Sequence, residues 1–277
     1  MVRIILAGIL LLALSVSCSC DEGSGDPIVL MVDAGGHRLE MVLKGTGSPA
    51  VVFDAGMVGG AQNWDSVRDS VAFHTSTVVF ERAGFGLSEI GPSPRSANQL
   101  ALELRTALGN AGISLPIVLV GHSAGGLYSR VFASLFPDDI AGLVFVDAAT
   151  EEVYEYMQQS DPARWEGYVE EVRESHRPAP GWFGQWEALP LSLDQARASW
   201  PLPEVPTVVV SALTPAGEWP LASRKDMEVW ARAQRAFADR IPGAKHVEIP
   251  DAHHMSLLHD PGLRTAVLEV WAQAAGR

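Results

Sequence analysis

The pentapeptide Gly121-His122-Ser123-Ala124-Gly125 sets a serine hydroxyl between two glycines. The apolar run 117–120 leads into it and a helical pattern follows at once, so the glycines permit a sharp turn that lifts Ser123 above a sheet. The N-terminus of a helix favours a developing negative charge at that point. A serine hydroxyl is a weak nucleophile near neutral pH and needs a base within hydrogen-bond reach. The motif predicts acyl transfer through a serine nucleophile, with water as the usual acceptor.

Two adjacent histidines near the C-terminus offer that base. They lie in the segment Asp251-Ala252-His253-His254-Met255, and the residues alone leave the choice between His253 and His254 open. The other histidines are expected to be surface or packing residues: His37, His74, His122, His176, His246 and His259. No cluster of His, Cys and acidic residues has metal-ligand spacing and no Gly-rich phosphate loop follows the first strand, so the predicted chemistry needs neither metal nor cofactor.

Short apolar runs predict the strands that must position these groups. They are residues 28–33, 38–43, 50–54, 77–80, 116–120, 142–146, 206–210 and 245–249. The first two flank Ala34-Gly35-Gly36-His37, which is typical of a hairpin. Most of the others are continuous β-branched runs, which indicate strands covered on both faces, as in a parallel sheet.

Helical patterns alternate with these runs at residues 98–108, 124–136, 224–238 and 263–274. The alternation predicts an α/β fold with a doubly wound, mostly parallel sheet. The segment 150–203 interrupts the rhythm and is rich in aromatic residues, so we expect a mostly helical cap above the carboxyl edge of the sheet. Residues 28–277 would then form one domain with this cap as an insertion.

Composition limits the partners. The chain has 277 residues, 47% hydrophobic and 19% charged, which is enough apolar material for one large core. Its formal net charge of −13 disfavours nucleic acid and anionic membrane surfaces as partners. A small-molecule acyl substrate is the expected partner, and the oligomeric state stays open.

The N-terminus has its own pattern. One arginine, a short apolar run and small residues over 1–20 are typical of a secretory signal, and the run is short for a bilayer span. Ser15-Val16-Ser17-Cys18 resembles a bacterial lipoprotein cleavage box, with 21–27 as a flexible tether. We expect an exported protein, either a cell-envelope lipoprotein carrying a lipid on Cys18 or a secreted protein; retention of the segment as an anchor is the alternative. Cys20 is the only other cysteine.

Taken together, the motifs over nearly the whole mature chain resemble the α/β-hydrolase superfamily. The resemblance assigns the base to His254, which lies seven residues before Pro261 as in the family, while His253 stands where the family usually has Gly. It implies two backbone donors for an oxyanion, the N–H groups of Met57 and Ala124. Ala55 replaces the family's usual His, which leaves the backbone donor in place. The segment 81–88 resembles the family's Asp-x-x-Gly-x-Gly-x-Ser turn and is expected to support the site from beneath.

The third residue of the expected triad, the carboxylate that orients the histidine, is not assigned by one motif alone. Most relatives carry it after the strand that follows the cap, where this chain has no carboxylate before Glu218. Some relatives place it at the end of the preceding strand, where Asp147 stands, and the order Ser123, Asp147, His254 agrees with the superfamily. We therefore expect Asp147, with Glu218 or a missing acid as alternatives.

The predicted function is hydrolysis of a carboxylic ester or related acyl bond, on a small or medium, partly apolar substrate, through an acyl-enzyme intermediate. Amidase, peptidase, thioesterase, lactonase and carbon–carbon hydrolase activities use the same triad and stay open. Epoxide hydrolases and haloalkane dehalogenases of this fold carry Asp at the nucleophile position, so Ser123 argues against both. A non-catalytic ligand-binding protein with a hydrolase fold is the alternative from another class.

Overall fold

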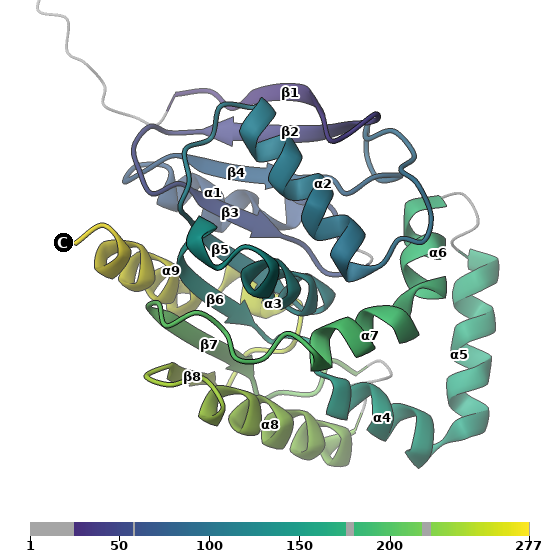
Figure 1. Ribbon diagram of the computed structural model, residues 1–277. Helices are drawn as coiled ribbons and strands as arrows, with labels where there is room; N and C mark the ends of the chain where they lie inside the picture. The colour runs from purple at the N-terminus through teal and green to yellow at the C-terminus, as the bar shows by residue number, and fades with distance from the viewer. Residues whose placement is uncertain (1–24, 58, 176–179, 218–222, 277) are drawn as a thin grey trace, which may run out of the picture.

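A computed structural model describes residues 25–57, 59–175, 180–217 and 223–276. Its centre is one sheet in the order β1-β2-β4-β3-β5-β6-β7-β8 (Figure 1). The strands are β1 Ile28–Asp33, β2 Arg38–Lys44, β3 Val51–Asp54, β4 Thr77–Phe80, β5 Ile117–His122, β6 Ile140–Val146, β7 Thr207–Ala212 and β8 Lys245–Ile249. The hairpin β1–β2 runs antiparallel, as does its junction with β4, and all other neighbours are parallel. The predicted α/β fold with a mostly parallel sheet is confirmed.

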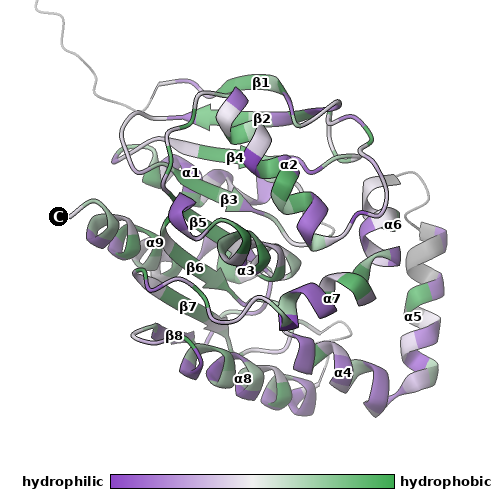
Figure 2. Cartoon of the chain, viewed as in Figure 1, coloured by the Kyte–Doolittle hydropathy of each residue, from purple (hydrophilic) through white to green (hydrophobic). Residues whose placement is uncertain are grey.

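Helices cover both faces of this sheet (Figure 1). They are α1 Asp65–Val71 and α9 Pro261–Ala274 on one face, and α2 Ala97–Asn110, α3 Ala124–Leu135 and α8 Arg224–Asp239 on the other. Alternate residues of a strand point to opposite faces, so Ile117 and Leu119 enter one core while Val118 and Val120 enter the other. Figure 2 shows the result, with apolar strands inside and helices that are polar outward.

The described residues of the connection between β6 and β7 form four helices: α4 Glu151–Ser160, α5 Pro162–Ser175, α6 Pro180–Glu187 and α7 Leu189–Arg197. Helix α7 packs on α2 and α3, and α4 packs on α8, so these helices extend from one end of the sheet (Figure 1). We call residues 150–203 the cap. Within the described ranges, no helix is long and apolar enough to cross a bilayer.

The structure differs from the sequence-based expectation in detail. Strand β5 continues to His122, so Ser123 is the first residue beyond the strand. Helix α1 was not predicted, because its seven residues hold one apolar pair, Val67 and Val71, among polar ones. Short 3-10 helices also occur: η1 Ala61–Trp64, η2 Pro137–Asp139 and η3 Ser256–His259. The predicted signal with Cys18, most of the tether, His176 and Glu218 lie outside the described residues.

Candidate active site

Ser123 lies in a strained turn between β5 and α3. Its φ of 53° and ψ of −123° are rare for a residue with a side chain. The turn is held because the Ser123 N–H donates to the carbonyl of Val146 at 3.0 Å, and the Ser123 carbonyl accepts from Gly126 and Ala149 at 3.0 and 2.9 Å. A Cβ at Gly125 would lie 2.4 Å from the carbonyl oxygen of Asp54, so the backbone at the end of β3 lies too close to this position for any residue larger than glycine. The strand-to-helix turn predicted from the pentapeptide is present.

His254 and Asp147 meet at the carboxyl ends of the strands. The Nδ1 atom of His254 lies 2.6 Å from Oδ2 of Asp147, whose side chain is fully buried. Asp147 has φ of 44°, a conformation that Asp tolerates better than most residues with side chains. His253 instead directs Nδ1 toward the N–H of Ser256 in its own turn, at 3.4 Å. Of the two adjacent histidines, the structure brings His254 to the carboxylate.

The second oxygen of Asp147 has two further partners. Oδ1 accepts hydrogen bonds from Nε1 of Trp230 at 2.7 Å and from the N–H of Ala212 at 3.1 Å. The indole ring of Trp230 also meets the His254 ring edge to face, with centroids 5.5 Å apart. These bonds give hydrogen-bond partners to a buried carboxylate oxygen that would be costly to leave without them. Sequence reasoning missed Trp230, because nothing in the pattern of α8 distinguishes it from a packing residue.

His122 is buried behind His254. Its ring centroid lies 4.4 Å from that of His254, and its Nε2 lies 3.1 Å from the His254 carbonyl oxygen. Burial, with the neighbouring His254 as a second cause, holds the pKa of His122 well below 6.5, so the ring is neutral and Nε2–H donates to that carbonyl. The residue was expected to have a packing role; it also anchors the backbone of His254.

The two predicted oxyanion donors lie close to Ser123. The loop after β3 touches the start of α3, since a Cβ at Gly56 would lie 3.3 Å from Cβ of Ser123. Met57, next in the chain, is buried. Ala124 opens α3, and the first N–H groups of a helix have no acceptor within it. Met57 and Ala124, which carry these N–H groups, belong to the apolar cluster that contains Trp182 and Trp186 of the cap.

Among the residues that the structure describes, no group of three or more His, Cys, Asp or Glu side chains is arranged to hold a metal ion.

Comparison with known proteins agrees with this architecture. Residues 49–179 match the family model described as the alpha/beta hydrolase fold. The protein YqjL of Bacillus subtilis is 28% identical over 133 residues, which cover 48% of this chain and 49% of YqjL. The chain spans between 14% and 49% of the length of eight curated relatives that it matches.

Solved structures match over most of the chain. A thermophilic esterase from Thermogutta terrifontis has 21% identity and a TM-score of 0.58, covering 90% of this chain and 99% of the esterase. A serine hydrolase involved in carbazole degradation, the CarC enzyme, has 20% identity and a TM-score of 0.62, covering 90% of this chain and 100% of that enzyme. At these identities the likeness shows a shared fold. Together with the family model over residues 49–179 and the eight-stranded sheet, it shows that the chain has the α/β-hydrolase fold.

Proposed function

We propose that this hydrolase-fold protein is a serine hydrolase that cleaves a carboxylic ester or related acyl bond through an acyl-enzyme intermediate. The observation that carries the proposal is the 2.6 Å contact between His254 Nδ1 and Asp147 Oδ2. Since Nδ1 is held by the carboxylate, the other ring nitrogen, Nε2, is the one free to act as a base. Asp147 orients the ring and stabilises the imidazolium that forms.

The reaction has two halves. Ser123 Oγ attacks the substrate carbonyl while His254 takes its proton, and the N–H groups of Met57 and Ala124 stabilise the negative oxygen of the tetrahedral intermediate. The carbon–oxygen bond to the leaving group breaks, and the leaving group departs with the proton from His254. A water molecule then attacks the acyl-enzyme, giving its proton to His254, and collapse returns that proton to Ser123 and releases the acid.

A partly apolar substrate suits the surroundings of the two amides. Met57 and Ala124 share an apolar cluster with Trp182 and Trp186, and Phe85 packs against it. Ligand sites are mostly apolar with a few polar groups for orientation. The supporting likenesses to an esterase and a serine hydrolase concern the fold.

The test is hydrolysis of a p-nitrophenyl ester series from acetate to decanoate, with anilide and thioester analogues beside it. We expect turnover that disappears in Ser123→Ala, and fluorophosphonate labelling of the wild type but not of this variant. A wild type that turns over none of these substrates, or a Ser123→Ala variant that is labelled equally, would contradict the serine mechanism and favour a non-catalytic binding protein.

Export is a separate proposal, supported by the pattern of residues 1–20. We propose that the protein reaches the cell envelope or the medium, with a lipid on Cys18 when it is anchored. Radiolabelled fatty acid should enter the wild type and not Cys18→Ser; equal labelling of both would exclude this site.

A further inference from the structure

Arg82 lies beneath the loop after β3, in the segment 81–88, with its side chain only 5% exposed. Its guanidinium donates from Nη1 to the carbonyl oxygen of Ala55 at 2.7 Å and from Nη2 to that of Gly56 at 2.5 Å. Nη1 also contacts Oδ1 of Asp54 at 2.5 Å. One cation thus holds three consecutive residues that lead to Met57.

The contact with Gly56 reaches the oxyanion donor directly. The Gly56 carbonyl and the Met57 N–H belong to one peptide group, which is planar and, in its usual trans form, points the two bonds in opposite directions. A bond from Arg82 to the carbonyl oxygen therefore fixes the direction of the N–H on the far side. Hydrogen bonds to a charged group also polarise their partners, so this N–H becomes a stronger donor.

The guanidinium is itself held from the cap. Its Nε donates to Oε1 of Gln185 in α6 at 3.0 Å, and Nε2 of Gln185 donates to the Gly181 carbonyl at 3.1 Å. Gln185 is fully buried. The backbone of α6 also lies close to the segment that contains Arg82, since a Cβ at Gly181 would lie 2.2 Å from the Ala83 carbonyl oxygen.

We infer that Arg82 is a positioning residue that aims and polarises the Met57 N–H, and that Gln185 holds Arg82 so that the cap and the oxyanion loop are coupled. The inference rests on the proposed function. Lysine cannot replace Arg82, because one ammonium group cannot reach two carbonyls, a carboxylate and an amide in the fixed geometry of a guanidinium.

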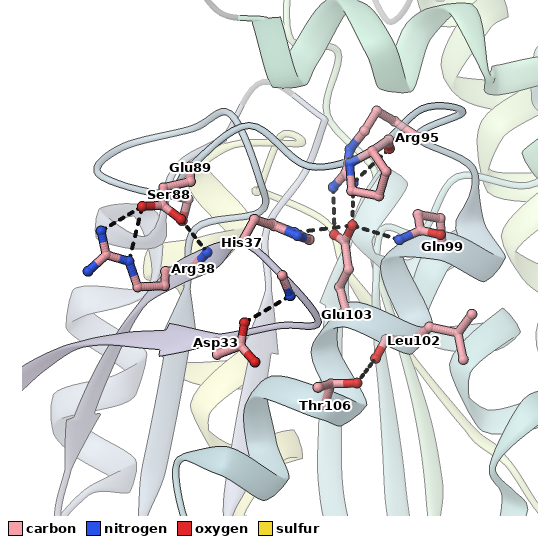
Figure 3. Close-up of polar contacts among 12 residues, drawn as sticks. Asp33, His37, Arg38, Ser88, Glu89, Arg95, Gln99, Leu102, Glu103 and Thr106 are labelled. Carbon is pink, nitrogen blue, oxygen red and sulfur yellow. Dashed lines mark hydrogen bonds and ion pairs between the residues drawn. The ribbon is translucent and has the colours of Figure 1, made fainter.

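A purely structural role makes a different prediction. If Arg82 only neutralises the buried Asp54, its loss lowers stability and leaves the rate per folded molecule unchanged. Arg95 supplies the matched control: it is 3% exposed and paired with the buried Glu103, close to His37 and Gln99 (Figure 3). Its guanidinium donates to Glu103 and to the Pro92 carbonyl, whereas that of Arg82 donates to the carbonyls of Ala55 and Gly56.

The experiment compares kcat and KM of Arg82→Lys and Arg95→Lys on p-nitrophenyl butyrate, each per folded active molecule. Losing an oxyanion donor outright costs ~10²–10³-fold in kcat, so we expect ~10-fold or more for Arg82→Lys with KM within ~2-fold of wild type. Arg95→Lys should keep kcat within ~2-fold. Equal behaviour of the two variants would overturn the inference.

Two further variants keep the test decisive. Gln185→Leu should lower kcat, whereas Gln185→Glu, which keeps an oxygen that accepts from Arg82, should keep most of the wild-type kcat. If both variants have the wild-type kcat, Gln185 of the cap does not act on the oxyanion loop through Arg82. Met57→Pro deletes the N–H, so Arg82→Lys should add less than ~2-fold to its loss. A full multiplicative loss would show that Arg82 acts elsewhere.

Hydrogen exchange gives a readout that needs no turnover. Amides of Gly56 and Met57 should exchange faster in Arg82→Lys than in Arg95→Lys, measured on peptides that cover them. Faster exchange without any Ser123-dependent turnover would preserve the anchoring role and reject the proposed function. Unchanged exchange together with unchanged kcat would reject the inference alone.

Discussion

The indole N–H of Trp230 donates a 2.7 Å hydrogen bond to Oδ1 of Asp147, from a position 83 residues further along the chain. The other oxygen of the same carboxylate faces His254. Helix α8, which packs on one face of the sheet, thus holds one oxygen of the Asp147 carboxylate.

Trp230→Phe keeps a ring in place and removes the N–H donor. A hydrogen bond to a charged group contributes about 1.5–3 kcal/mol, so we expect the free energy of unfolding to fall within this range, and kcat to fall several-fold, because Asp147 loses a restraint. Urea unfolding and ester hydrolysis measure the two effects. Trp200→Phe is the control, since the indole nitrogen of Trp200 has no hydrogen-bond partner among the described residues. Equal losses in the two variants would argue against a role for this bond.

Asp147→Asn should lower kcat by ~10³–10⁴-fold, because the neutral amide neither stabilises the imidazolium nor selects the required tautomer of His254. Asn tolerates the positive φ of this position, so the turn itself should survive. Circular dichroism and steady-state kinetics separate these effects. Glu218→Gln is expected to keep the wild-type rate; a large loss there, with Asp147→Asn active, would transfer the role to Glu218.

Gly125→Ala should destabilise the protein by roughly 1–3 kcal/mol, because the new methyl group meets the backbone carbonyls of Asp54 and Ala55 at 2.4 and 2.5 Å. Gly109→Ala is the matched control, since nothing lies within 4 Å of its Cβ position in α2. Alanine is favoured over glycine inside a helix by about 0.5–1 kcal/mol, so that control should be neutral or stabilising. Thermal unfolding of both variants tests the contrast.

Stability should fall as the pH drops below 6.5, in part because of His122. The pKa of His122 in the folded protein lies well below that of histidine in the unfolded chain. Below pH 6.5 the unfolded state therefore binds a proton that the folded state does not, and the free energy of unfolding falls as the pH falls. One such proton changes the free energy of unfolding by at most about 1.4 kcal/mol per pH unit. His122→Gln keeps a donor for the His254 carbonyl but does not titrate.

The measurement for His122 is the slope of the unfolding free energy between pH 6.5 and 5. We expect a shallower slope in His122→Gln than in the wild type, whatever the absolute stability. His246, whose pKa is lowered chiefly by burial, contributes to the slope in both proteins and cancels in the difference. Identical slopes would mean that His122 is protonated in the folded protein over this range.

Much of the fold was predictable because its signals are local. Apolar runs of four to six residues predicted the strands, and the spacing of apolar residues predicted α2, α3, α8 and α9. Helix α1 escaped because seven residues with one apolar pair carry too weak a period. The extension of β5 to His122 escaped because Gly121 and His122 carry no strand preference.

The sequence by itself determined the turn at Ser123 and the expectation that a histidine near the C-terminus would meet it, since a glycine-flanked serine between strand and helix is a local feature. Only the tertiary structure separated His254 from His253 by geometry and set Asp147 beside it. It alone showed the hydrogen bonds that Trp230 and His122 donate, and the hydrogen bonds from Arg82 to the loop after β3. The residues that form these hydrogen bonds are 26 to 132 positions apart in the sequence, and strand order and helix packing bring them together. No local sequence pattern specifies which distant groups will form a hydrogen bond.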